Sequence, residues 1–126
     1  MRYARWVFTV AGIVGILTIA PLFFLEGVMA KATGPITHPE NYYGFAGVTL
    51  AWQFVYLVIG RNPAPYRPIM LLGAFGKVLF AGSVWTLFTL GRVAISVPAI
   101  ASADLVLAAL FVIAWVKTRP TPSSSY

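Results

Sequence analysis

The chain has 126 residues, of which 60% are apolar and 10% charged, and its net charge is +6. Soluble domains are about one quarter charged, and a chain this short cannot bury so large an apolar fraction in a single water-exposed core. The composition therefore argues against a soluble enzyme, a nucleic-acid-binding domain and a disordered chain. It predicts an integral membrane protein. The absence of cysteine excludes disulfides, thiolate metal sites and cysteine nucleophiles.

Four apolar runs are each long enough to cross a membrane as a helix. At about 1.5 Å per residue, about 20 helical residues span a hydrocarbon core of roughly 30 Å. The first two runs carry no charge, the third carries only Lys77 and the fourth only Asp104. These runs predict an all-α, four-helix, up-down bundle that forms one transmembrane domain over residues 1–117. The expected spans are residues 6–25, 43–60, 69–91 and 97–116.

The two ends of the chain need separate interpretation. Arg2 and Arg5 precede the first run, as in a signal peptide, but a run of about 20 residues exceeds the apolar length of about 7–15 usual for such peptides. We therefore expect a retained span. Residues 118–126 are rich in proline and serine, which predicts a disordered tail.

The basic residues predict an orientation. Four spans place both termini on one side, and that side holds six basic residues, whereas the other side holds Lys31 and Arg92. The positive-inside rule then places the termini and the turn at residues 61–68 in the cytoplasm, and we expect a multi-pass membrane protein. The net positive charge thus reflects orientation, and no nucleic-acid partner is expected. The six residues are Arg2, Arg5, Arg61, Arg67, Lys117 and Arg119.

Polar side chains at membrane depth are candidate site residues, because an ionisable group there costs several kcal/mol. Helical spacing places each of them on the same helix face as small residues. For example, Gly73 and Gly76 share a face with Lys77. Small residues in turn mark close helix contacts in lipid. The sequence therefore predicts that all these faces point into one bundle interior. The expected polar cluster consists of Lys77, Asp104, Gln53 and Glu26.

This cluster has three interpretations, which the sequence leaves open. It can form a polar cavity that binds a small amphipathic ligand or relays a proton or an ion. It can instead be a contact of Lys77 with Asp104 or Gln53 that only sets the helix register. In the third interpretation, Lys77 extends to the cytoplasmic surface and Asp104 reaches outward past Ser102.

The expected outer loop, residues 26–42, holds a second group of candidates: His38, Glu40 and Tyr42. His38 and Glu40 can act as an acid–base pair, which is the basis of an enzyme hypothesis. One histidine and one glutamate are too few ligands for a tight metal site, so no metal is expected. The alternative is a helix start, with a proline in the first turn and tyrosines at the membrane interface.

Arg61 and Arg67 flank a proline-rich turn on the predicted cytoplasmic side. They are candidates for binding anionic lipid headgroups, or they serve the topology alone.

Three short segments carry a resemblance to a known group. They are Glu-Asn-Tyr-Tyr-Gly-Phe at 40–45, Pro-Ala-Pro-Tyr-Arg at 63–67 and Ser-Ala-Asp-Leu-Val-Leu at 102–107. Together with the four short spans, they make most of the chain resemble small bacterial membrane proteins of the DoxX-like group. The resemblance implies an association with redox- or quinone-linked membrane complexes and stress-related accessory roles. It implies no catalytic residue.

The sequence shows no catalytic constellation, so it favours a non-enzymatic accessory or structural subunit of a larger inner-membrane assembly. The expected partners are membrane lipids and other membrane subunits or a second copy of the chain. No cofactor is expected in the chain itself, and contact with a quinone or pigment is expected only through partners. The alternative is a membrane binding or transport module for a hydrophobic or weakly acidic ligand, using Lys77, Asp104 and Gln53.

Overall fold

The computed structural model describes residues 1–120, and helices form most of this part of the chain. Four helical segments are long and apolar enough to cross a membrane, as the sequence predicts, and the chain is therefore a multi-pass membrane protein. The elements, with η marking 3₁₀-helices, are α1 (Arg2–Ile19), η1 (Ala20–Phe24), α2 (Glu26–Thr33), α3 (Pro39–Arg61), η2 (Ala64–Tyr66), α4 (Arg67–Thr89) and α5 (Ser96–Lys117).

Prolines and glycines set several of the helix ends. α1 ends at Ile19 because Pro21 has no N–H to continue the α-helical hydrogen bonds, and the chain proceeds as η1. Pro39 is the first residue of α3, where a missing N–H costs nothing. Gly34 (φ +100°) ends α2, and Gly91 (φ +72°) turns the chain after α4. Both glycines adopt a backbone conformation that other residues rarely enter.

Two segments differ from the sequence prediction. Residues 26–42, expected as a loop, contain the short helix α2. Thr118, expected in the disordered tail, is buried, and its hydroxyl accepts a hydrogen bond of 3.1 Å from Arg67 Nε. The ordered chain thus continues past the end of α5, because a polar partner from another helix fixes this residue. The remainder of the predicted tail from 121 onward lies outside the described residues.

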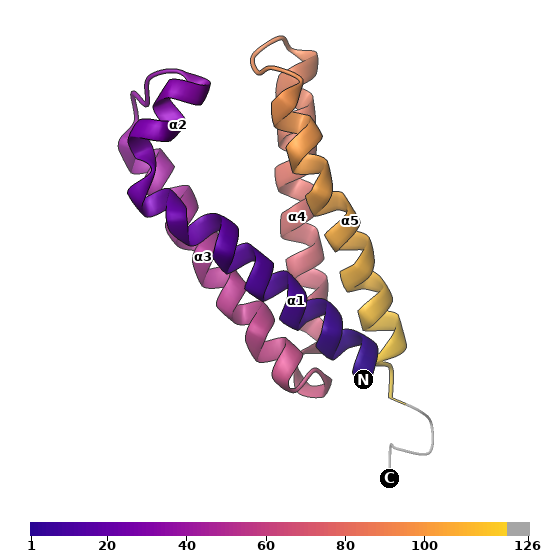
Figure 1. The fold of residues 1–126 in the computed structure, drawn as a ribbon. Helices are drawn as coiled ribbons and strands as arrows, with labels where there is room; N and C mark the ends of the chain where they lie inside the picture. The colour runs from indigo at the N-terminus through magenta and orange to yellow at the C-terminus, as the bar shows by residue number, and fades with distance from the viewer. Residues whose placement is uncertain (121–126) are drawn as a thin grey trace.

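The long helices form two pairs. α1 packs along α3 and α4 packs along α5; the pairs contact each other through α1 and α5 and diverge toward the end that carries α2 (Figure 1). The main core lies where all four helices meet, and Phe8, Tyr56 and Phe111 form its aromatic part. The Phe111 ring centre lies 4.3 Å from that of Phe8 and 4.9 Å from that of Tyr56. A second buried cluster, around Val84, joins only α4 and α5.

Glycines bring the backbones of α1 and α3 close together. A Cβ atom at Gly12 would lie 2.8 Å from the backbone oxygen of Gln53, and one at Gly60 would lie 2.8 Å from the backbone nitrogen of Thr9. A Cβ at Gly15 would overlap the Gln53 side chain. Without a hydrophobic driving force between helices in lipid, such close packing is a principal source of helix association.

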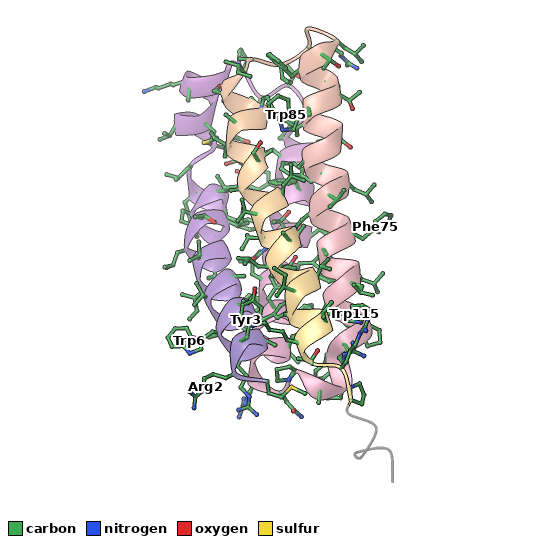
Figure 2. All side chains as sticks on the ribbon, turned by 90° about the vertical axis from the view of Figure 1, so that its right-hand side faces the viewer. Arg2, Tyr3, Trp6, Phe75, Trp85 and Trp115 are labelled. Carbon is green, nitrogen blue, oxygen red and sulfur yellow. The ribbon has the colours of Figure 1, made fainter. Side chains whose placement is uncertain are left out.

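The outer faces of the helices are apolar and uncovered. Figure 2 shows Trp6 and Phe75 pointing away from the bundle, and these side chains are 68% and 58% exposed. Surface of this kind is unfavourable in water but is solvated by acyl chains. The exposed apolar surface therefore agrees with the composition in assigning the helices to a bilayer.

Candidate ligand-binding site

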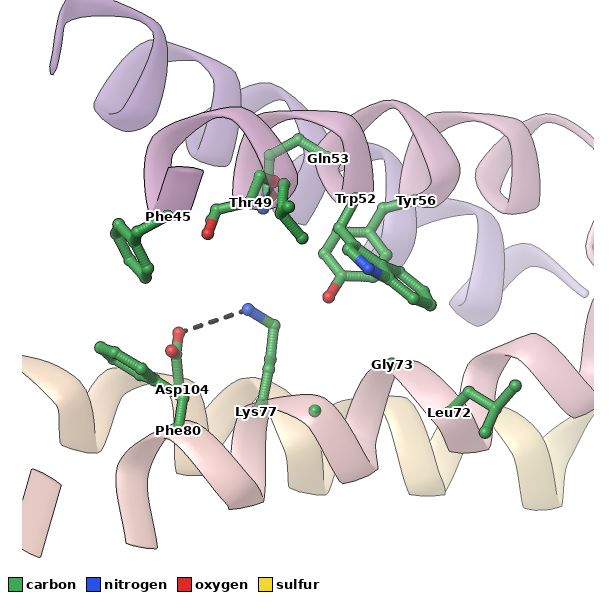
Figure 3. A pocket seen from close by; sticks show the side chains of 12 residues that line it. Phe45, Thr49, Trp52, Gln53, Tyr56, Leu72, Gly73, Lys77, Phe80 and Asp104 are labelled. Carbon is green, nitrogen blue, oxygen red and sulfur yellow. Dashed lines mark hydrogen bonds and ion pairs between the residues drawn. The ribbon is translucent and has the colours of Figure 1, made fainter. Parts of the chain in front are cut away.

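A cavity of about 330 Å³ lies between α3 on one side and α4 with α5 on the other (Figure 3). Its size falls within the range of about 300–1,000 Å³ that is typical of small-molecule sites. Aromatic side chains form much of its wall, whereas Lys77 and Asp104 are its only charged lining residues. A mostly apolar cavity with a few convergent polar groups is the usual composition of a ligand site. The aromatic residues are Phe45, Trp52, Tyr56 and Phe80.

Lys77 and Asp104 form an ion pair at this cavity, with 3.3 Å between Nζ and Oδ1. Because the two side chains meet and are only 12% and 29% exposed, the interpretation in which Lys77 extends to the cytoplasmic surface and Asp104 reaches outward is wrong. The Lys77 ammonium also lies 5.4 Å from the centre of the Tyr56 ring and 5.8 Å from that of Phe111. Both rings present electron-rich faces that favour a cation, so this environment holds the ammonium within the bundle.

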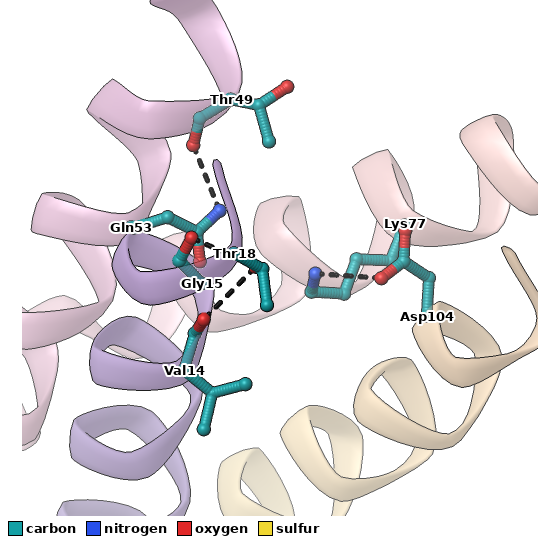
Figure 4. A network of polar contacts seen from close by, with 7 residues as sticks. All are labelled: Val14, Gly15, Thr18, Thr49, Gln53, Lys77 and Asp104. Atoms are coloured by element: carbon teal, nitrogen blue, oxygen red, sulfur yellow. Dashed lines mark hydrogen bonds and ion pairs between the residues drawn. The ribbon is translucent and has the colours of Figure 1, made fainter. Parts of the chain in front are cut away.

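Gln53 lies across the cavity from this ion pair, on α3 (Figure 4). Its Nε2 donates a hydrogen bond of 2.9 Å to the backbone oxygen of Thr49, one turn earlier. Its amide group packs over Gly15 of α1, where a larger residue would leave no room. The structure thus places Lys77, Asp104 and Gln53 around one cavity, where Lys77 pairs with Asp104 and makes no hydrogen bond to Gln53 within residues 1–120.

Glu26 does not line the cavity. The sequence prediction assumes one regular α-helix over residues 15–26, which places Glu26 on the same helical face as Gly15. Pro21 ends the α-helix earlier, and Glu26 becomes the first residue of α2. Because the helical spacing is interrupted at the proline, the expected face does not continue to Glu26.

The outer-segment candidates lie at the start of α3. His38 Nδ1 and Glu40 Oε1 are 3.3 Å apart, and both side chains are 70% exposed. The Tyr42 hydroxyl donates a hydrogen bond of 2.6 Å to the backbone oxygen of Leu22, in the 3₁₀ segment that follows the break in α1. Tyr42 thus anchors this segment to α3. Within residues 1–120, no group of three His, Cys, Asp or Glu side chains is placed to hold a metal ion.

Arg61 and Arg67 differ in their surroundings. Arg67 donates a hydrogen bond of 2.7 Å from Nη2 to the backbone oxygen of Trp115, and its guanidinium lies 4.8 Å from the centre of that indole ring. With the additional hydrogen bond to Thr118, Arg67 caps the carboxyl end of α5. Arg61 is exposed at the end of α3. Of the two residues, Arg61 has the side chain that is open to a lipid headgroup.

Two aromatic wall residues of the cavity, Phe45 and Trp52, were missed by the sequence interpretation. Helical spacing could have found them, because positions 45, 49, 52 and 56 are three or four residues apart and therefore share one face of α3. Phe45 stacks on Phe80 of α4, with ring centres 5.6 Å apart. This stack joins the two helix pairs at one end of the cavity. Apolar residues are so common on all sides of a membrane helix that spacing alone does not distinguish the wall of a cavity from the lipid-facing surface.

No protein-family model, curated protein or solved structure matches the chain. The geometry of the cavity is therefore the basis on which a function is proposed.

Proposed function

We propose that this protein is a small membrane module that binds a hydrophobic or weakly acidic molecule in the cavity, with Lys77, Asp104 and Gln53 as its polar contacts. The supporting observation is an ion pair that faces a mostly apolar cavity. An ion pair that only set the helix register would be packed on all sides, because empty space beside it forfeits dispersion contacts. A ligand supplies those contacts.

The proposed ligand enters sideways from the bilayer. Val48 of α3 and Leu72 of α4 line the cavity and are also 63% and 53% exposed at the outer surface of the bundle. The cavity therefore opens between these two helices, at a surface that acyl chains cover. A lipid-soluble molecule reaches the ion pair by this route without crossing water.

A photoreactive amphiphile tests the proposal. We suggest dodecanoic acid with a diazirine on its chain, added to the full chain in lipid nanodiscs, with the labelled residues mapped by mass spectrometry. Labelling is expected on residues that line the cavity. Gly76→Leu should abolish it, because Gly76 lines the cavity and a Cβ there meets no atom within 4 Å, so the leucine fills the cavity without displacing the helix backbone.

Gly82→Leu is the matched control for this experiment. Gly82 lies on the same helix, has equally open surroundings, and does not line the cavity. This variant should label like the unmodified chain. Equal labelling of the Gly76→Leu and Gly82→Leu proteins would overturn the proposed binding site.

We further propose that the chain crosses a bacterial inner membrane four times in up-down order, with both termini in the cytoplasm. The excess of basic residues at the termini supports this orientation. Lys117 Nζ lies 4.6 Å from the centre of the Tyr3 ring, so the start of α1 and the end of α5 are neighbours. Thr37→Cys and Asn62→Cys variants of this cysteine-free chain test the orientation. An impermeant maleimide added outside spheroplasts should label the Thr37→Cys protein and should not label the Asn62→Cys protein.

A second candidate function is that of an accessory subunit in a larger membrane assembly, in line with the resemblance to DoxX-like proteins. The observation that favours it is α2, which buries none of its eight residues against the described chain. A helix this short is marginal in water by itself, so a partner surface or the membrane interface would stabilise it. Co-purification in mild detergent tests this role, and recovery of the chain alone in every mild detergent would argue against it.

A further inference from the structure

We infer that the cavity binds a long-chain carboxylic acid, and that Asp104 takes up the acid's proton as the resulting carboxylate binds Lys77. This inference rests on the proposed binding function and names the ligand class.

The first argument is the number of hydrogen-bond donors without a partner at the cavity. The Lys77 ammonium has three N–H groups, and within residues 1–120 it makes one hydrogen bond, to Asp104. The Tyr56 hydroxyl makes none to the described chain, although Tyr56 is only 4% exposed, and Figure 3 shows this hydroxyl pointing into the cavity. These donors lie on facing helices and suit a ligand head that accepts several hydrogen bonds. A carboxylate does so, whereas an ammonium head would be repelled by Lys77.

The second argument is charge balance. Lys77 and Asp104 are the only charged residues that line the cavity, and their charges sum to zero. An anion that entered alone would leave one negative charge uncompensated at membrane depth, which is costly. A neutral ester keeps the charge balance, but its carbonyl accepts a weaker hydrogen bond from Lys77 than a carboxylate does. A carboxylic acid brings one proton for the Asp104 carboxylate, so the total charge of the site stays zero while Lys77 binds a carboxylate.

The proton transfer is a balanced exchange between two carboxyl groups. The O–H bond of the ligand breaks, an O–H bond forms on an Asp104 oxygen, and no electrons are gained or lost. A carboxyl group held at Lys77 Nζ adjoins Asp104, because Nζ and Oδ1 are only 3.3 Å apart. Tyr56 of α3 is the one other titratable residue at the cavity wall; α4 and α5 add none beyond the ion pair, and α1 supplies no lining residue.

The third argument concerns the tail of the ligand. The Phe45–Phe80 stack joins α3 and α4 at one end of the cavity, whereas Val48 and Leu72 mark the opening toward the bilayer. With its carboxylate on Lys77, the acid extends its chain along apolar walls and out through this opening. A long alkyl chain is favoured in both environments relative to water, because each CH₂ group placed there removes apolar surface from water. A short, water-soluble acid lacks that gain.

The test uses dodecanoic acid labelled with ¹³C at its carboxyl carbon, and the full chain in phosphatidylcholine nanodiscs. Protein-free nanodiscs correct for partitioning into lipid. The acid should bind, and methyl dodecanoate should bind about tenfold more weakly or worse, as expected when a charge-assisted hydrogen bond is lost. Difference infrared spectra should show a ¹³C-carboxylate band from the ligand together with a new protonated carboxyl band from the protein. Asp104→Asn should lack the protein band, because this variant has no carboxyl group at position 104. The ¹³C label shifts the band of the ligand and so distinguishes it from the band of the protein.

The pH dependence gives an independent readout. Uptake of one proton per bound carboxylate makes the affinity of the unmodified chain fall about tenfold for each unit of rising pH, once the free acid is ionised. In Asp104→Asn the carboxylate binds Lys77 without a proton, so that loss should disappear. Tyr56→Phe, which removes only a hydroxyl, should weaken binding several-fold. Tyr43→Phe, outside the cavity, should not.

The outcomes separate this inference from the proposed function. Equal binding of acid and ester with no new protein band would overturn the proton transfer and leave the binding function standing. Failure of both molecules to bind would overturn both proposals. Lys77→Met should abolish acid binding. If this variant does not fold, acid binding by Tyr56→Phe tests the role of the hydrogen-bond donors at the cavity. Unchanged acid binding in Tyr56→Phe, with the pH dependence retained in Asp104→Asn, would refute the inference.

Discussion

Lys77 and Asp104 are 27 positions apart in the sequence, yet their side chains meet across the interface between α4 and α5, 3.3 Å apart. Each side chain by itself would place one charge at membrane depth, which is costly. As a pair, they neutralise each other and link the two helices at the cavity that they line. The same contact therefore bears on both the stability of the bundle and the chemistry of the proposed site.

The ion pair should show strong coupling on mutation. Lys77→Met and Asp104→Leu should each lower the free energy of unfolding by about 1.5–3 kcal/mol, because each removes a charge-assisted hydrogen bond and leaves one partly buried charge without a partner. The double variant should cost clearly less than the sum, since both charges are gone. Unfolding in mixed detergent micelles measures all three. Additive losses would show that the two side chains do not interact energetically.

The contact between α1 and α3 should be sensitive to a single methyl group. Gly60→Ala places a Cβ against the Thr9 backbone, which cannot move aside without shifting α1. We expect a loss of about 1–3 kcal/mol, the usual cost of overpacking. Thermal unfolding in detergent measures it. Gly82→Ala is the control, because a Cβ there meets no atom within 4 Å and alanine favours a helix by up to about 1 kcal/mol. Equal stability of the two variants would contradict the tight contact.

The hydrogen bond from the Tyr42 hydroxyl to the Leu22 backbone oxygen should stabilise the segment after the break in α1. Tyr42→Phe should lower stability by about 1 kcal/mol, the typical net value of one hydrogen bond, and should speed amide hydrogen exchange in η1 and α2. Tyr43→Phe serves as the control, since the Tyr43 hydroxyl makes no hydrogen bond to the described residues. Unchanged exchange in η1 after Tyr42→Phe would argue against an anchoring role.

Arg67 should hold the carboxyl end of α5 in place. Arg67→Gln removes the hydrogen bond to Trp115 and the one to Thr118, and exchange of the last-turn amides of α5 should accelerate by about tenfold or more, as expected for hydrogen bonds from a charged donor. Arg61→Gln, at an exposed residue on the same side, should leave this region unchanged. A similar acceleration in both variants would indicate a general charge effect.

Helical spacing within single helices singles out Lys77, Asp104 and Gln53, and these three residues line one cavity. Thr49, Gln53 and Tyr56 share a face of α3 at steps of three or four, and this is the face that lines the cavity. The prediction failed at Glu26, because the 3₁₀ segment around Pro21 interrupts the helical repeat. It also left open which partner Lys77 takes, because spacing within one helix carries no information about a neighbouring helix.

The sequence by itself determined that this chain forms four helices long and apolar enough to cross a membrane, because apolar length and the need to satisfy backbone hydrogen bonds in lipid allow few alternatives. It also determined which residues are costly to place there. Only the tertiary structure decided that Lys77 turns to Asp104 and that the helix pairs leave a cavity beside them. The physical reason is that pairing and voids depend on how separate helices pack, and packing depends on the shapes of facing side chains.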